Sequence, residues 1–368
     1  MLSELLITVI IITALTTFLA LIMVIADRTI ANYGQQEITI NGEKKIVVDG
    51  GKPLLSSLKE KQIFIPSACG GKGSCGLCKI QVNSGAGEYL PTELPWIDPR
   101  EREKNIRLSC QVKVKKPFDI TIPRELFNIK QYKTAVESLV DLTHDIKQVT
   151  LKLENSEGIS FKAGQFIQFE VPLYEMTDEP VYRAYSISSP PSRKDAVELE
   201  IRYVPDGLCT TYVHKYLKEG QKVMINGPYG DFFLRDSQRD IVCIAGGSGM
   251  APIKSILLDM NEKKINRKAV YFFGARSKRD LFLVEEMQRL EKELPDFRFI
   301  PSLSQPEESD SWEGETGLIT ECVEKHVKNG ENAEAYLCGS PGMINACVDV
   351  LTNRCGVKKD LIFYDKFS

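Results

Sequence analysis

Residues 240–260, DIVCIAGGSGMAPIKSILLDM, contain the most informative pattern in the chain. An apolar strand from Ile241 to Ala245 runs directly into a glycine-rich turn. The helix predicted after the turn places its apolar residues on one face: Ile253, Ile256, Leu257 and Met260. Glycines let the backbone approach a phosphate, and the amino end of a helix attracts its negative charge. The stretch therefore predicts a dinucleotide phosphate site.

The turn is a weak signal alone, because the G-x-G-x-x-G fingerprint is absent. Its candidate binding residues are Gly246, Gly247, Gly249 and Pro252. Two further loops follow predicted strands, GARS from Gly274 and CGSPG from Cys338, and they add Arg276, Cys338 and Gly339 as candidates. Ligands of open α/β sheets bind at the carboxyl ends of strands, where all three features lie.

Apolar strands and amphipathic helices alternate over residues 238–368. The predicted strands are IVCIAG, AVYFFG, FRFIPSL, AEAYLCG and LIFYDKF. Five strands with intervening helices predict a parallel, doubly wound α/β domain. A basic run, Arg276, Lys278 and Arg279, either binds the 2′-phosphate of NADPH or forms a solvated loop, so the residues alone leave the choice between NADH and NADPH open.

Residues 131–236 show the period-two pattern of strands, as in VTLKLE, FIQFEVP and VELEIRYV. This pattern predicts an antiparallel β-barrel. Arg183, Tyr185 and Ser186 could supply the cation and the aromatic and hydroxyl groups that a flavin dinucleotide needs, and Gly207 and Thr210 open a helix that could face its phosphates. The alternative is a surface arginine and a core tyrosine in an ordinary barrel.

The segment SACGGKGSCGLCKI, residues 67–80, spaces three cysteines as C-x5-C-x2-C, and a fourth follows at Cys110. One glycine-rich loop with a distant fourth cysteine is typical of a 2Fe-2S cluster ligated by Cys69, Cys75, Cys78 and Cys110. A four-cysteine zinc site is the alternative, but such sites usually have two C-x2-C pairs. The cysteines lie in a predicted β-grasp-like ferredoxin domain, residues 35–124, with a hairpin turn at Asn41-Gly42.

An uncharged apolar run from Leu5 to Ala26 is long enough, at ~1.5 Å per residue, to cross the roughly 30 Å core of a bilayer. Residues 1–27 are therefore predicted to be a transmembrane anchor. A cleaved signal peptide is the alternative. Such peptides have a positively charged region before the apolar run, whereas the residues before this run include Glu4 and contain no Lys or Arg. Because Arg28 and many lysines follow, we expect a single-pass protein of the inner membrane with its catalytic domains on the cytoplasmic side.

Composition excludes some partners. The net charge of −3, from 47 basic and 50 acidic residues, gives no basic footprint, so no nucleic acid is expected to bind. Scattered cysteines suit a reducing compartment and are expected to be small buried hydrophobes: Cys209, Cys243, Cys322, Cys347 and Cys355. The histidines, His144, His214 and His326, are expected to be structural.

These motifs together resemble the ferredoxin-NAD(P)H reductase superfamily with an added plant-type ferredoxin module. Within it, the chain is most similar to the NADH-oxidising component, which carries FAD and 2Fe-2S, of the sodium-translocating NADH:quinone oxidoreductases. The resemblance covers nearly the whole chain and rests on the anchor, the x5 spacing where ordinary plant-type ferredoxins have x4, and the segments PTELP, RAYS, GPYGDFF, GGSGMAP, FGARSKRD and LCGSPGM.

The resemblance implies roles for residues. It assigns FAD binding to Arg183, Tyr185, Ser186 and Thr210, and the nicotinamide side to residues 246–252 with Cys338. Tyr185, Cys338 and Phe367 would lie at the catalytic centre, where Phe367 covers the flavin until nicotinamide displaces it. Relatives with GARSKR use NADH. Two segments depart from the family: only about ten residues separate FEVP from RAYS, and the chain ends in YDKFS.

We therefore predict an NADH dehydrogenase component that passes electrons from NADH through FAD and the 2Fe-2S cluster to a membrane partner, such as other integral subunits of a redox complex or another membrane electron acceptor. One alternative is a reductase that serves an oxygenase or other soluble acceptor, which the anchor disfavours. Another is an iron-sulfur scaffold that binds no flavin.

Overall fold

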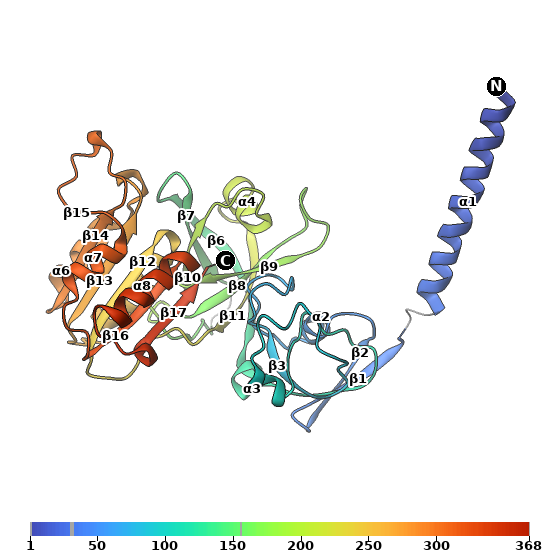
Figure 1. Cartoon of the computed structure of the whole chain (residues 1–368), viewed down its shortest axis with the longest axis horizontal. Coiled ribbons are helices and arrows are strands. Elements are labelled where there is room, and N and C mark those ends of the chain that lie inside the picture. Colours follow the sequence, from blue (N-terminus) through green and yellow to red (C-terminus); the bar gives the residue numbers. More distant parts are fainter. Residues whose placement is uncertain (1, 30–32, 155–156, 368) are drawn as a thin grey trace. The chain divides into compact units, whose positions relative to one another are not determined.

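The computed structural model describes residues 2–29, 33–154 and 157–367 (Figure 1). The chain forms two compact units, Met1–Asn128 and Ile129–Ser368. The first begins with α1 (Leu2–Thr29), which contains the exposed apolar stretch Leu5–Val24 with a mean hydropathy of 2.7. By length and composition this helix is able to cross a membrane.

The remainder of the first unit is built on a five-stranded sheet in the order β2-β1-β5-β3-β4. Asn41 and Gly42 both have positive φ, 54° and 72°, which confirms the predicted hairpin turn. The strands and helices are β1 (Gln35–Ile40), β2 (Lys44–Asp49), α2 (Leu54–Glu60), β3 (Lys79–Ser84), α3 (Pro99–Glu103), β4 (Ile106–Leu108) and β5 (Phe118–Thr121). A single apolar core packs α2 against this sheet.

The second unit begins with a curled antiparallel sheet in the order β10-β7-β6-β11-β8-β9. Its two edges approach each other closely enough for Ile187, after β9, to pair with Leu199 of β10. The elements are β6 (Lys130–Asp141), β7 (Ile146–Leu153), β8 (Phe166–Val171), β9 (Val181–Ser186), β10 (Ala196–Arg202), α4 (Leu208–Lys215) and β11 (Lys222–Tyr229). This half-barrel corresponds to the antiparallel barrel predicted from the period-two pattern.

A parallel sheet in the order β15-β14-β13-β12-β16-β17 follows. Its elements are β12 (Asp240–Gly246), α5 (Met250–Glu262), β13 (Ala269–Ala275), α6 (Val284–Glu293), β14 (Phe297–Leu303), β15 (Glu315–Thr316), α7 (Ile319–His326), β16 (Ala333–Gly339), α8 (Pro341–Asn353) and β17 (Ile362–Lys366). The five predicted strands are present, and β15 is a sixth that is too short to show a periodic pattern.

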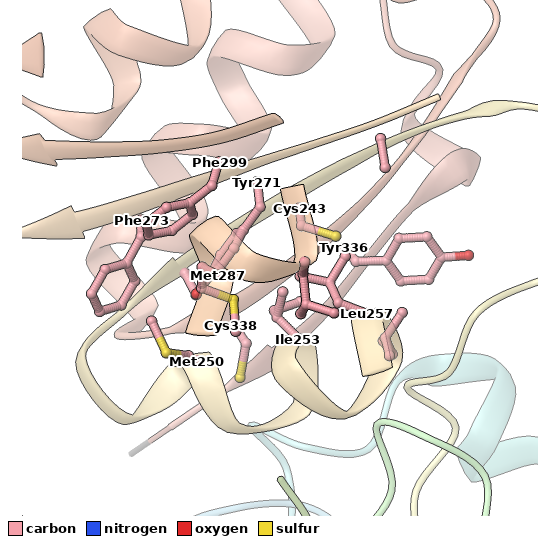
Figure 2. Packing of buried hydrophobic residues seen from close by; sticks show 14 of the residues in the cluster. Cys243, Met250, Ile253, Leu257, Tyr271, Phe273, Met287, Phe299, Tyr336 and Cys338 are labelled. Atoms are coloured by element: carbon pink, nitrogen blue, oxygen red, sulfur yellow. The ribbon is translucent and has the colours of Figure 1, made fainter. Parts of the chain in front are cut away.

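Helices cover both faces of the parallel sheet, as a doubly wound fold requires. One core contains apolar residues of α5 and α6, and Figure 2 shows part of it around Tyr271 and Leu257. The other core contains residues of α7 and α8. This arrangement brings the carboxyl ends of β12, β13 and β16 to one edge, because the three strands are neighbours in the sheet.

Candidate functional site

The cysteine loop of the first unit depends on its glycines. Gly70, Gly71, Gly73 and Gly76 all have positive φ, between 65° and 89°. A Cβ atom on Gly76 would also lie 2.6 Å from the Trp96 ring. Other residues would therefore strain the loop, which explains the glycine-rich sequence around the cysteines.

The four cysteines of the predicted cluster lie together as two hydrogen-bonded pairs. Cys75 donates to Cys69, which lowers the pKa of Cys69 to about 4. Cys78 donates to Cys110 and lowers its pKa to about 7. Backbone amides of the loop also donate to these sulfurs. Thiolates surrounded by amide donors are what an iron-sulfur cluster requires, so the four residues fit that group.

A buried ion pair supports this loop, and it explains the PTELP segment. Glu93 is fully buried and accepts hydrogen bonds from Arg107 at 2.9 and 2.6 Å. Its carboxylate also accepts from the backbone amides of Leu90 and Leu108, so it ties the segment to β4 just before Cys110. Burial opposes ionisation, but these hydrogen bonds hold the pKa of Glu93 below its usual value. Sequence reasoning did not single out either residue.

The predicted flavin residues come from two neighbouring elements of the half-barrel. Arg183, Tyr185 and Ser186 lie on β9, and Gly207 and Thr210 lie at the start of α4. The two elements meet where the Tyr185 hydroxyl contacts the Cys209 thiol. Burial raises the pKa of Tyr185 well above its usual value, so this hydroxyl stays protonated.

Arg183 is the cation of this group. Its Nη1 atom donates to the carbonyl oxygen of Tyr182 at 2.8 Å, and it forms no ion pair with a carboxylate among the residues that the structure describes. A half-buried guanidinium without a carboxylate fits an anionic ligand such as a pyrophosphate. The Thr210 hydroxyl, by contrast, bonds to the backbone of Val204 at 3.0 and 3.1 Å, so it also fixes the loop before α4.

The three glycine loops of the nucleotide domain converge at one edge of the sheet. Gly246 pairs with Gly274, and Ala245 pairs with Cys338. A Cβ atom on Gly249 would lie 2.3 Å from the Cys338 carbonyl oxygen, so only glycine fits there. Pro252 is buried in the first turn of α5. The structure thus brings together the nucleotide residues that were predicted from separate segments.

Cys338 and Phe367 both lie beside this edge. Cys338 is buried, whereas Phe367 is half-buried. The Cys338 side chain is fully buried in the core shown in Figure 2, near Met250. Burial, with a smaller contribution from the negative charge of Asp365, raises the pKa of Cys338 well above its usual value. The backbone amide of Phe367 donates to the Gly339 carbonyl oxygen at 2.9 Å, which holds the chain end against the third loop.

Arg202 is a candidate that sequence reasoning missed. One of its Nη atoms lies 3.7 Å from the position that a Cβ would take on Gly247, in the glycine turn. Its Nε atom donates to Asp145 at 2.7 Å, and its side chain is 59% exposed. A cation at the end of the VELEIRYV strand was the available signal, but only the fold places this arginine next to the turn.

A buried ammonium joins the half-barrel to the nucleotide domain. Lys254 of α5 is 3% exposed and lies 3.2 Å from Glu198 and 3.9 Å from Glu200, both on β10. It also lies 3.6 Å from Glu286 of α6. Both carboxyl oxygens of Glu200 are buried without a hydrogen-bond partner, and burial raises the pKa of Glu200 to about 8. One lysine thus connects α5, which follows the glycine turn, to the half-barrel.

Replacing Glu200 by Gln should make the second unit more stable at pH 8 but not at pH 4. In the folded chain Glu200 keeps its proton up to about pH 8, whereas its ordinary pKa is 4.5. The folded state therefore binds the extra proton between these values, and wild-type stability falls as pH rises through that window. Glutamine cannot lose a proton, so the thermal midpoint of the variant should fall less than that of wild type as pH rises from 4 to 8. Each kcal/mol of difference in the free energy of unfolding corresponds to about 2–4 °C.

Thermal unfolding of both proteins across this pH range measures the difference. Glu285, which is exposed on α6, provides the control: in Glu285→Gln the thermal midpoint should change with pH as it does in wild type. Equal slopes for Glu200→Gln and wild type would contradict this account of Glu200.

Three family models match successive parts of the chain. They are a 2Fe-2S iron-sulfur cluster binding domain at residues 38–115, an oxidoreductase FAD-binding domain at 133–234 and an oxidoreductase NAD-binding domain at 243–349. All three predicted cofactor domains are therefore confirmed.

Solved structures agree with this arrangement. The chain is similar to the Amycolatopsis cytochrome P450 reductase GcoB, with a TM-score of 0.73, 26% identity, and coverage of 90% of this chain and 98% of that one. It is also similar to a ferredoxin reductase in carbazole 1,9a-dioxygenase, with a TM-score of 0.70, 25% identity and coverage of 91% and 98%.

Curated relatives match over the full length. The F subunit of the Na(+)-translocating NADH-quinone reductase of Neisseria meningitidis is 38% identical over 405 aligned positions, with 99% of each chain covered. Its counterpart in Methylococcus capsulatus is 36% identical, again over 99% of this chain. The alignments are longer than the 368 residues of this chain, which agrees with its shortened segment before RAYS. The chain therefore belongs to the family of F subunits of the Na(+)-translocating NADH-quinone reductases.

Proposed function

We propose that this chain oxidises NADH and delivers the electrons, one at a time, to a redox partner in the membrane. The observation that carries the proposal is the combination of a cysteine loop, a flavin half-barrel and a nucleotide domain in one chain that starts with an apolar helix. FAD, when bound, accepts an electron pair as hydride and releases single electrons, and a 2Fe-2S cluster carries one electron at a time.

The chain's own residues have separable tasks in this proposal. Arg183 and the amino end of α4 hold the FAD pyrophosphate, and Tyr185 and Ser186 line the flavin. The glycine turn at residues 246–249, with Arg202, holds the phosphates of NADH. Phe367 covers the flavin until nicotinamide displaces it, and Cys338 supports the loop beneath that position. Cys69, Cys75, Cys78 and Cys110 ligate the cluster.

We infer NADH rather than NADPH as the substrate from the relatives, which are named as subunits of NADH-quinone reductases. Arg276 donates to the Gln305 side chain at 2.7 Å, and Lys278 donates to the Asp310 carbonyl oxygen at 2.8 Å. Arg279 lies 4.0 Å from Asp280. Each cation of the basic run thus has a partner within the chain, and among the three only Arg279 faces a carboxylate. We expect a strong preference for NADH in steady-state assays with both nucleotides.

We further propose that α1 crosses the inner membrane once and leaves the catalytic domains on the cytoplasmic side, as the charges after the helix favour. The partner would be another integral subunit of a redox complex, with quinone as the final acceptor and sodium coupling as in the relatives' names. The test compares the full chain with a variant lacking residues 1–27. NADH-dependent quinone reduction in membranes should be lost in the variant, while reduction of ferricyanide persists.

The second candidate is a reductase for a soluble oxygenase, which the likeness to the cytochrome P450 and carbazole dioxygenase reductases favours. It requires no anchor. Unchanged electron delivery to membranes by the variant without residues 1–27 would therefore favour this candidate over a membrane partner.

Replacing Arg183 by Ala should weaken FAD binding. Loss of a charge-assisted hydrogen bond costs about 1.5–3 kcal/mol, which corresponds to roughly 10–100-fold in the dissociation constant. Flavin fluorescence during titration of the apoprotein with FAD measures this constant. Lys222→Ala, a 79% exposed cation on β11, is the control and should bind FAD like wild type. Equal affinities for Arg183→Ala and wild type would remove Arg183 from the site.

A further inference from the structure

Three side chains of metal-ligand type meet at the sheet edge formed by β15, apart from the nucleotide and cluster residues. Figure 1 shows β15 and α7, the two elements that carry them. They are Glu315 of β15 and Cys322 and His326 of α7. One ligand atom from each lies within 4.8 Å of the other two. Apart from the four cysteines of the predicted cluster, it is the one group of three or more His, Cys, Asp or Glu side chains in the described part of the chain whose ligand atoms all lie this close together.

The local fold places these residues together. Cys322 and His326 are four positions apart on α7 and therefore lie on the same helical face. Gly317, with a φ of 99°, turns the chain between β15 and α7, so Glu315 reaches back to this face. The His326 ring also packs against Phe272 of β13, with ring centroids 6.1 Å apart. The strand, the turn and the helix thus fix all three ligands.

The sulfur ligand of the group is buried, whereas its oxygen and nitrogen ligands are partly exposed to solvent. Cys322 is 2% exposed, whereas the side chains of Glu315 and His326 are each 22% exposed. His326 Nε2 lies 2.8 Å from Glu315 Oε1, and Lys325 Nζ lies 2.9 Å from both carboxylate oxygens. The Lys325 side chain is 64% exposed, so it can leave the carboxylate without being moved through the core.

We propose that Glu315, Cys322 and His326 bind a zinc ion, with water as the fourth ligand. Zinc accepts sulfur, nitrogen and oxygen donors, and bonds of roughly 2.0–2.3 Å place tetrahedral ligand atoms about 3.3–3.8 Å apart. The three ligand atoms already lie within 4.8 Å of one another, about 1 Å from that spacing. Magnesium and calcium are excluded because they prefer oxygen donors alone.

Charge and proton balance are satisfied in this site. The Cys322 thiol releases its proton to solvent as the sulfur–zinc bond forms, and His326 binds as a neutral ring. One thiolate and one carboxylate then neutralise the dication. Lys325 leaves Glu315 as the ion enters, so it competes with zinc for the carboxylate. Strand β15 has only two residues. The ion would link this strand to α7 and would therefore stabilise this sheet edge.

The full chain with its cofactors is the material for the test. After incubation with zinc chloride and gel filtration, elemental analysis should find one more zinc per chain in wild type than in His326→Gln. Glutamine keeps the side-chain length at this partly exposed position, so the variant should fold. Cys322→Ser should weaken zinc binding in calorimetry by more than the roughly 10–100-fold that loss of an outer-shell partner costs.

Two further variants separate metal binding from a structural effect. Lys325→Met should bind zinc more tightly than wild type because the competing ammonium is gone. Glu324→Gln, on the same helix but outside the group, should bind zinc like wild type. Zinc should raise the thermal midpoint of wild type but not of His326→Gln. Equal zinc content and equal thermal response of wild type and His326→Gln would overturn the proposal.

Discussion

The Cys69→Ala variant should lose its 2Fe-2S cluster and all electron transfer beyond the flavin, while NADH still reduces the flavin. Cys69 lies on the loop whose sulfurs receive backbone hydrogen bonds, and its thiolate pairs with Cys75. A cluster held by four thiolates does not tolerate the loss of one to a methyl group. The flavin and nucleotide residues belong to the other compact unit, so their folding does not depend on this cysteine.

Three measurements check this result: iron content, the cluster signal in electron paramagnetic resonance after reduction, and rapid-mixing absorbance of the flavin with NADH. Lys72→Ala is the matched control, because Lys72 belongs to the same loop and has no sulfur atom. Lys72→Ala should retain iron, flavin reduction by NADH and electron transfer beyond the flavin. If Cys69→Ala also lost flavin reduction by NADH, the cofactor domains would not be separable in the way the two units indicate.

The Lys254→Met variant should strongly destabilise the second unit. Methionine keeps the length of the side chain but removes the charge that faces Glu198, Glu200 and Glu286. Removing one partner of a buried charge network leaves the others uncompensated, which costs about 3–5 kcal/mol. The free energy of unfolding, measured with a chemical denaturant and flavin fluorescence, should fall by that amount.

The control lies on the segment that directly follows the same helix. Lys263 pairs with Asp259 at 2.7 Å, but its side chain is 61% exposed, so Lys263→Met should cost only about 0–1 kcal/mol. Lys254→Arg keeps the charge, so its loss in the free energy of unfolding should lie between those of Lys254→Met and Lys263→Met. Similar losses for Lys254→Met and Lys263→Met would contradict the view that burial makes Lys254 important.

The domain order and the cofactor classes could be predicted from the sequence, because each depends on residues close together in the chain. The glycine turn after β12, the C-x5-C-x2-C spacing and the apolar stretch of α1 are local patterns. Strand β15 could not be predicted, because two residues carry no periodicity and this strand exists only through pairing with Ser302 and Leu303 of β14.

The supporting residues of the candidate sites also depended on the fold. Arg202 and Gly247 are far apart in sequence, and no local pattern links them. The sequence PTELP does not indicate whether Glu93 is exposed or buried. Only the structure shows its buried ion pair with Arg107. Cys338 was predicted at the catalytic centre, and the structure places its thiol in the core under the glycine turn.

Short-range patterns are thus enough to specify which cofactors this protein can bind, since cluster, flavin and nucleotide chemistry each require residue types at short, fixed spacings. Folding specifies which side chains support those sites and which are buried: the ammonium of Lys254 lies among three acidic side chains, and Glu315 meets Cys322 and His326. Most of these contacts join different elements of the fold. Their energies depend on burial and distance, which are properties of the folded chain and not of any local stretch.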